Sequence, residues 1–206
     1  MKIQLKTNWD AVTLKEYEQL TQILRADIPS DYKAVNLLAT LSDQDEKFFE
    51  ELPIALFTQL IPKIMFIHQE DIPEVKVKNR YEINGRRYEL HAEIPAISTA
   101  QYIDYMSYIK EEPIDLQKVI SVFLIPEGHK YNDGYDMKEV QADVHDMKIA
   151  DVLAISFFMK KQYGLFIQIT TYYLQKELKE MGMKKKQIKE TVDPLKDMVS
   201  SHLYSK

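Results

Sequence analysis

The stretch KVKNRYEINGRRYELHAE, from Lys76 to Glu93, predicts a β-hairpin. Its centre, Asn84-Gly85, is a preferred dipeptide for a two-residue type I′ turn, because both central positions of that turn need a positive φ. Folding the chain there sets opposite charges across from each other on one face and apolar or aromatic side chains on the other. The charged pairs are Glu82–Arg87, Arg80–Glu89 and Lys76–Glu93, and the other pairs are Tyr81–Tyr88, Val77–Ala92 and Val75–Ile94. A slip of one residue would mix the two faces, so the sequence predicts a single register with one exposed and one buried face.

The remaining sequence is typical of a helical protein. Its 5 Gly and 8 Pro are few for 206 residues, since average usage is roughly 7% and 5%, and this favours long helices over a fold with many turns. Capping boxes at Thr13–Glu16 and Ser98–Gln101 predict two helix starts. The predicted helices cover residues 13–26, 32–41, 45–49, 53–68 with a kink or split at Pro62, 99–109, 116–124, a short one from Asp136, 146–181 and two further pieces, the second starting at Asp193 and Pro194.

The longest predicted helix begins near Asp146 and ends near Met181, with Gly182 as its C-terminal glycine. Its first half is apolar nearly all round, which implies burial against several neighbours. The predicted fold class is therefore mainly α with one β-hairpin (α+β): a helical bundle with a long C-terminal helix. We divide the chain into an N-terminal helical part (1–72), the β-hairpin (73–95) and a C-terminal helical part (96–206), and expect them to form one compact unit.

Composition excludes several classes of function. The formal net charge of −5 gives no overall electrostatic attraction to nucleic acid. The absence of Cys excludes disulfides, a thiolate nucleophile and a Cys-ligated metal, and suits a reducing cytoplasm. The first ten residues lack the apolar core of a signal peptide. The longest apolar stretch, Ile149–Met159, is much shorter than the roughly 20 residues of a membrane span, so no span is expected.

The sequence contains no pattern that predicts catalysis, a cofactor or a metal site. None of the five His lies four residues from another, so a helical zinc pair is absent. His145 lies beside acidic residues, from Asp143 to Asp146, and we interpret it as a solvated helix end. The loop from Tyr131 to Asp136 resembles a calcium loop only faintly, because the EF-hand ligand positions lack carboxylates, and we expect a turn. We therefore predict no enzyme and no catalytic, cofactor-binding or metal-binding residues.

One basic cluster stands out near the C-terminus, at Lys184, Lys185, Lys186 and Lys189. Such charge suffices for contacts with phosphate that do not depend on base sequence. The acidic residues that follow it reduce this potential, and a solvated helix is the simpler interpretation. The alternative hypothesis is a nucleic-acid- or membrane-associated module that uses the cluster at 184–189.

Several stretches resemble, as a set, small helical proteins of tailed bacteriophages that infect Bacteroides-type gut bacteria, including crAss-like phages. They are WDAVTLKEY (9–17), LSDQDE (41–46), YEINGRRY (81–88), TAQYID (99–104), FLIPEG (123–128) and IADVLAISFF (149–158). The resemblance covers residues 9–179. Its motifs are structural, so they imply a class of protein and not a chemical activity.

The resemblance implies a non-enzymatic role as an assembly or virion structural protein that acts through helix-mediated contacts. A tail-assembly chaperone, an internal virion component and a built-in structural protein all fit it. The expected partners are other phage structural proteins, in a homo- or hetero-oligomer without nucleic acid. The expected location is the host cytoplasm during assembly, or the virion.

Overall fold

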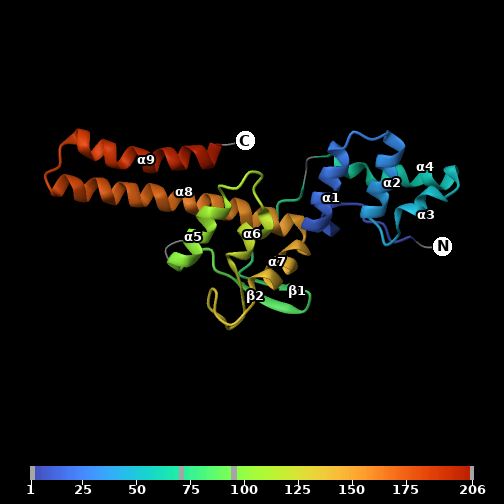
Figure 1. The fold of residues 1–206 in the computed structure, drawn as a ribbon, viewed down its shortest axis with the longest axis horizontal. Coiled ribbons are helices and arrows are strands. Elements are labelled where there is room, and N and C mark those ends of the chain that lie inside the picture. The colour runs from blue at the N-terminus through green and yellow to red at the C-terminus, as the bar shows by residue number, and fades with distance from the viewer. Residues whose placement is uncertain (1–2, 70–71, 94–96, 205–206) are drawn as a thin grey trace.

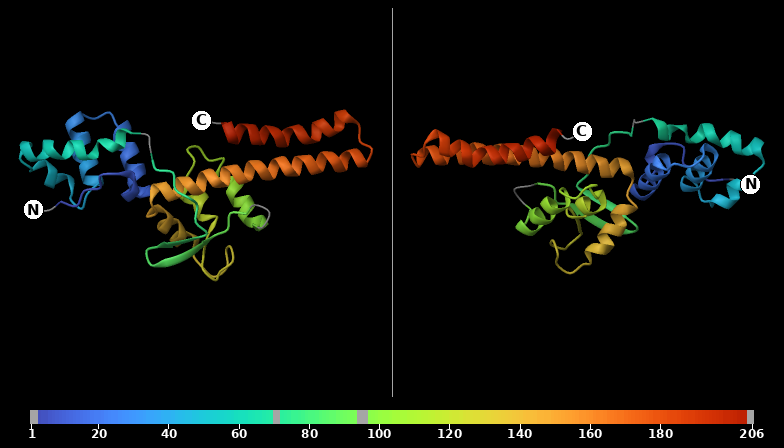
Figure 2. Two further views of the ribbon diagram at one scale, coloured as in Figure 1. Left: turned by 180° about the vertical axis from the view of Figure 1, so that it is seen from behind. Right: turned by 45° about the horizontal axis from the view of Figure 1, so that its top comes forward.

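The computed structural model describes residues 3–69, 72–93 and 97–204, with the side chains of the last helix described up to Pro194. The described chain is mainly helical, with one three-stranded antiparallel sheet. This confirms the predicted class of mainly α with one hairpin and a long C-terminal helix. The molecule is elongated in all three views, with the N-terminal helices at one end and a two-helix arm at the other (Figures 1 and 2).

The N-terminal part is a group of short helices. The capping box predicted at Thr13 is present: the Thr13 hydroxyl accepts from the Glu16 amide at 3.3 Å, and the Glu16 carboxylate accepts from the Thr13 amide at 2.8 Å. The second helix begins at Ser30, two residues earlier than predicted, directly after Pro29. The elements of this part are the 3₁₀ turn η1 (Trp9–Ala11), α1 (Leu14–Arg25), α2 (Ser30–Thr40), α3 (Glu46–Glu50), α4 (Ile54–Ile64) and the 3₁₀ turn η2 (Met65–His68).

The end of α4 is tied to the beginning of the chain. Pro62 lies inside α4, and the α-helix ends two residues after it and is followed directly by η2. The chain therefore changes helix type close to Pro62, but the predicted split at that residue does not occur. The Trp9 indole donates to the Gln69 carbonyl at 3.2 Å and lies edge-on to Phe66, with ring centroids 5.2 Å apart. Trp9 therefore holds the segment that follows α4 against the beginning of the chain.

The hairpin forms in the predicted register. Strands β1 (Arg80–Ile83) and β2 (Arg86–Leu90) are joined by Asn84 and Gly85, whose φ angles are +50° and +75°. The ladder pairs Arg80 with Glu89, Tyr81 with Tyr88 and Glu82 with Arg87. Tyr81 and Tyr88 are buried, and the charged side chains occupy the other face.

The outer part of the predicted hairpin does not form. Strand β1 begins at Arg80, so the predicted pairs Lys76–Glu93 and Val77–Ala92 are not part of the ladder. The last bond between the two arms runs from the Leu90 amide to the Asn79 carbonyl at 2.9 Å. The next amide, that of His91, donates to the Phe123 carbonyl at 2.8 Å, because the chain after β2 follows a third strand instead. The pair Val75–Ile94 lies outside the described residues.

The third strand was missed by the sequence analysis. The predicted helix 116–124 is shorter, α6 (Leu116–Ser121), and the chain then enters β3 (Leu124–Pro126), which pairs with β2. Leu124 and Ile125 are completely buried. The free edge of β2 offers backbone hydrogen-bond partners to an extended strand but not to a helix. Pairing with β2 therefore outweighs the helix that the local apolar pattern predicted.

The C-terminal part contains α5 (Thr99–Tyr108), α6, α7 (Met137–His145), α8 (Ile149–Glu180) and α9 (Lys185–Tyr204). Helix α8 begins three residues later than predicted, because the chain just before it exchanges backbone hydrogen bonds with the N-terminal part. The Leu14 amide donates to the Met147 carbonyl at 2.8 Å, and the Ile149 amide donates to the Val12 carbonyl at 2.9 Å. This short antiparallel exchange joins the N-terminal part to the start of α8.

The last two helices form an arm. Helix α8 has 32 residues and ends, as predicted, before Gly182, whose φ is +76°. Helix α9 runs back alongside α8 as a single helix that contains Pro194, where two pieces were predicted. The start of α8 lies between the N-terminal helices and the sheet, and its distal half extends away from both (Figure 1). The boundaries predicted at 72/73 and 95/96 stay predictions.

Buried tyrosines are a large part of the central core. The Tyr105 ring lies edge-on to Phe123 and Tyr163, with centroids 5.1 Å and 5.8 Å apart. Burial raises the pKa of Tyr105 to about 12 and also raises the pKa of Tyr163 above its ordinary value. The folded protein therefore holds these phenols in the neutral form.

These tyrosines predict a loss of stability at high pH. The unfolded chain releases the Tyr105 proton near pH 10.0, whereas the folded chain holds it to about pH 12. The contribution of the neutral Tyr105 side chain to the free energy of unfolding is thus complete below pH 10.0 and is lost as pH rises toward about 12. Urea unfolding at a series of pH values is expected to show a smaller alkaline loss for Tyr105→Phe than for the unchanged chain. Tyr32→Phe, at an exposed position, is expected to leave the alkaline loss unchanged, and an equal effect of both variants would contradict the assignment.

Gly85 allows a direct test of the hairpin turn. No atom lies within 4 Å of a Cβ added there, but its φ of +75° is unfavourable for any residue with a Cβ. Gly85→Ala is expected to lower the free energy of unfolding by about 1 kcal/mol. Arg87→Ala, on the exposed face next to the turn, is the control and is expected to change it by less than about 0.5 kcal/mol. Chemical denaturation measures both values, and a neutral Gly85→Ala would argue against the type I′ turn.

Candidate functional site

A buried carboxylate joins α7 to the hairpin turn. The Asp143 side chain is 1% exposed, and its Oδ1 accepts from the side chains of Asn84 at 3.0 Å and Arg86 at 3.2 Å. Its Oδ2 accepts from Arg86 Nε at 2.9 Å and from the Tyr88 hydroxyl. Four donors thus fill the positions at which a carboxylate accepts hydrogen bonds.

This cluster has a structural role. Burial, together with the Asp143 carboxylate, raises the pKa of Tyr88 above its ordinary value, so its hydroxyl stays protonated and keeps donating. This cluster was not predicted from the sequence, where residues 143–146 were interpreted as a solvated helix end. The sequence feature that could have indicated the burial of Asp143 is the helical spacing. Asp143 lies three residues after Val140 on the same helix, and both are buried.

His145 is also engaged in a contact between elements. Its Nε2 lies 2.9 Å from Glu18 Oε2, and this links α7 to α1. His145 is, as predicted, at the end of a helix, and its side chain is 31% exposed. The contact with Glu18 was not predicted, because it forms only when α7 packs beside α1, which is distant in sequence.

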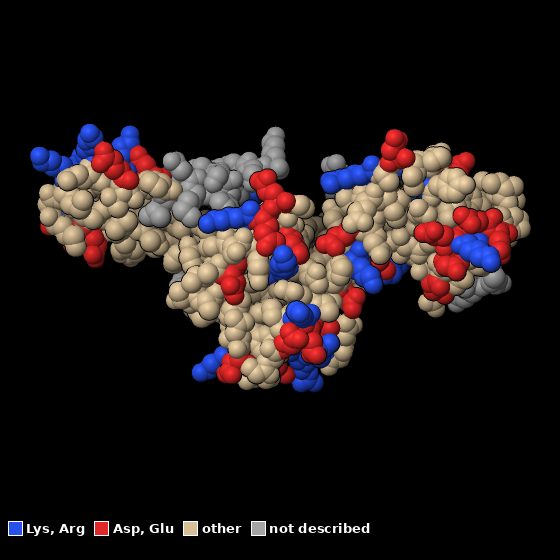
Figure 3. Space-filling view, viewed as in Figure 1, with Lys and Arg blue, Asp and Glu red and all other residues tan. Residues whose placement is uncertain are grey.

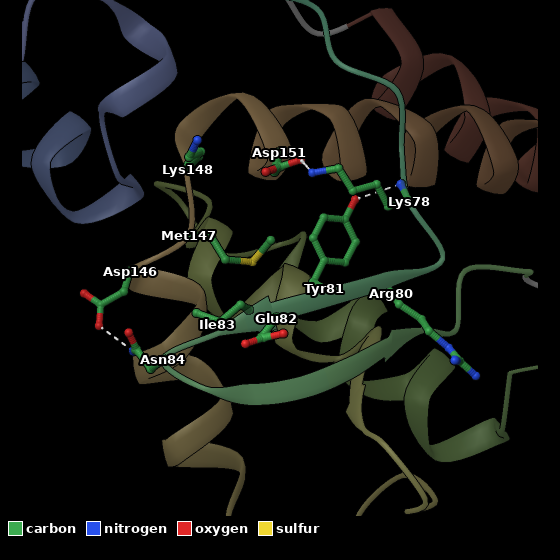
Figure 4. Close-up of a pocket in the computed structure, with 10 residues that line it drawn as sticks. All are labelled: Lys78, Arg80, Tyr81, Glu82, Ile83, Asn84, Asp146, Met147, Lys148 and Asp151. Carbon is green, nitrogen blue, oxygen red and sulfur yellow. Dashed lines mark hydrogen bonds and ion pairs between the residues drawn. The ribbon is translucent and has the colours of Figure 1, made fainter.

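A groove of about 380 Å³ lies between β1 and the start of α8 (Figure 4). Lys78 Nζ lies 3.1 Å from Asp151 Oδ1, and the Lys78 amide donates to the Tyr81 hydroxyl at 3.0 Å. These opposite charges neutralise each other at the groove, so it has no uncompensated charge from this pair to attract a ligand. It is lined by Lys78, Arg80, Tyr81, Glu82, Ile83, Asn84, Asp146, Met147, Lys148 and Asp151.

The loop that resembled a calcium site is a turn, as predicted. Asn132 and Gly134 have φ angles of +60° and +78°. His129 Nδ1 lies 3.0 Å from the Asp133 carbonyl, so the loop is closed by its own groups. Throughout the described ranges, no three His, Cys, Asp or Glu side chains are grouped so that they could hold a metal ion.

The basic cluster lies at the tip of the arm, where α8 turns into α9. Lys184, Lys185, Lys186 and Lys189 are all exposed, and the blue side chains at the tip are visible in Figure 3. Lys186 and Lys189 each lie 3.9 Å from an acidic side chain one helical turn ahead. Exposed pairs of this kind are weak. A contact between this cluster and phosphate stays a prediction.

Among the described residues, helix α8 carries more large exposed apolar side chains than any other helix. We define the α8 stripe as Phe157, Leu165, Ile169, Tyr172 and Tyr173, which are 67%, 51%, 47%, 65% and 60% exposed. In an α-helix, each residue advances by about 100° around the axis. From Leu165 onward the stripe therefore lies opposite the buried residues of the same helix. Those buried residues are Tyr163, Gly164, Ile167 and Thr171.

The comparisons with known proteins found no relative. The chain has no significant match among protein-family models, curated protein sequences or solved structures. Among the described residues, no helix is both long enough and apolar enough to cross a membrane. The candidate functional surface is therefore chosen from the structure itself, and it is the α8 stripe, because its large apolar side chains are exposed.

The Asp143 cluster predicts a strong dependence of stability on one carboxylate. Asp143→Ala leaves the buried Tyr88 hydroxyl without its acceptor and is expected to destabilise the fold by about 2 kcal/mol. Glu139→Ala is the matched control, because Glu139 also binds Arg86, at 2.7 Å, but is 65% exposed. Its expected effect is below about 1 kcal/mol. Chemical denaturation measures both, and an Asp143→Ala effect no larger than that of Glu139→Ala would contradict the structural role.

Proposed function

We propose that this chain is a bacteriophage assembly or virion structural protein that works through helix-mediated contacts with other proteins. The resemblance of residues 9–179 to small helical phage proteins supports the origin. The elongated fold supports a role in helix-mediated contacts. The N-terminal helices and the two-helix arm lie at opposite ends of the molecule and present separate surfaces (Figure 1).

The observation that carries the proposal is the α8 stripe. A helix inside a globular body buries its apolar face, whereas the distal half of α8 extends beyond the body and keeps four of the five α8-stripe side chains exposed. Contiguous exposed apolar patches on soluble proteins mark interaction sites. The stripe is therefore the surface on which we expect a protein partner.

Exposed apolar side chains also occur at the opposite end of the molecule. Ile54 and Leu56 on α4 are 74% and 50% exposed, and Met65 on η2 is 48% exposed. Helix α4 and the arm are at opposite ends in Figure 1. A protein with exposed apolar side chains at each end is suited to bridge two neighbours, as an assembly factor or a structural component does. Its partners would be other phage structural proteins, in the host cytoplasm during assembly or in the particle.

The proposal predicts that the protein accompanies phage proteins during infection. Quantitative mass spectrometry of purified particles, and of complexes cross-linked in infected cells, is expected to find the chain in one or both samples. Cross-links are expected to fall on the α4 end or on the arm. The control is an abundant early phage protein without a structural role, which is expected in neither sample. Absence of the chain from both samples would contradict the proposal.

A further inference from the structure

One row of exposed side chains on α8 has a symmetrical order. Lys161, Leu165, Ile169, Tyr173 and Glu177 follow one another at intervals of four residues, and all five are exposed. Residues four apart form a continuous ridge on a helix surface. We call this set the α8 ridge. It consists of three large apolar side chains between a cation at one end and an anion at the other.

The α8 ridge remains accessible on the arm. Helix α9 packs on α8 through Ile188 and Val192, which are 7% and 0% exposed. The buried α8 residues of this stretch, such as Ile167 and Thr171, lie on the side of the helix opposite the ridge. A second helix can consequently approach α8 without displacing α9.

We propose that the α8 ridge is a homodimer interface, in which the α8 helices of two copies pack antiparallel with Ile169 at the twofold axis. In this arrangement Leu165 of each copy lies opposite Tyr173 of the other. Lys161 lies opposite Glu177 at both ends. Two helices cross at about −50°, the commonest crossing angle in globular proteins, when the four-residue ridges of one lie in the grooves beside those of the other.

Charge selects the antiparallel arrangement over the parallel one. In a parallel pair with the same central residue, Lys161 would face Lys161 and Glu177 would face Glu177. Like charges at these positions oppose association, and opposite charges favour it. The ridge is complementary to itself only when one copy is reversed, and this is the relation that a twofold axis creates.

This inference deepens the proposed function, because it names a second copy of the chain as one partner, but its test uses the purified chain alone. A monomeric chain found in phage assemblies would overturn the dimer and keep the function. A dimer that is absent from phage complexes would do the reverse.

Cysteine cross-linking tests the geometry directly, because the chain contains no Cys. Ile169→Cys places its thiol at the twofold axis, and mild oxidation of the full chain is expected to yield a disulfide-linked dimer. Thr170→Cys is the matched control: it is also exposed, but points about 100° away around the helix and is expected to cross-link far less. Equal cross-linking of the two variants, or none in either, would overturn the proposal.

Sedimentation equilibrium of charge variants provides the second test. Lys161→Glu sets two carboxylates against each other at each end and is expected to weaken dimerisation about three- to tenfold. Glu177→Lys is expected to have the same effect, and the double variant is expected to restore the original affinity. These positions are exposed, so circular dichroism should show unchanged folding. A monomeric original chain, or a double variant as weak as either single one, would overturn the assignment.

Discussion

The structure depends on the need of α8 to bury an apolar surface that extends around most of its circumference. The first half of the helix achieves this between the N-terminal helices and the sheet, where Val152 and Ile155 are completely buried. The distal half projects beyond both parts, where α9 covers one side of it. One helix on one side leaves the opposite side exposed, and the α8 stripe is the result. Architecture and proposed function therefore share one cause.

Two sets of polar contacts fix the position from which α8 projects. The backbone exchange between residues 12–14 and 147–149 holds the first turn of the helix against the N-terminal part. The Asp143 carboxylate holds the preceding helix, α7, against the hairpin turn. Because α7 and α8 are separated by only three residues, both contacts act on the same joint. The direction of the arm is thus set by these hydrogen bonds together with the packing of the first half of α8.

Local signals were sufficient to predict the elements that depend on neighbours in sequence. The Asn84-Gly85 turn, the capping boxes and the terminal Gly182 each act through groups a few residues apart, and the structure confirms them. Strand β3, the late start of α8 and the Asp143 cluster depend on partners more than 30 residues away. An apolar run such as 122–125 fits a helix or a strand equally well, and only the free edge of β2 decides between them.

The central claim is that the α8 stripe is accessible in the single chain and covered on association. Hydroxyl-radical footprinting of the purified protein, read by mass spectrometry at low and high concentration, tests it most directly. The account predicts strong labelling of the α8 stripe when dilute and protection of Leu165, Ile169 and Tyr173 when concentrated. Met181, 73% exposed near the tip, should stay labelled at both concentrations. Equal labelling of the stripe at both concentrations, or weak labelling when dilute, would contradict the account.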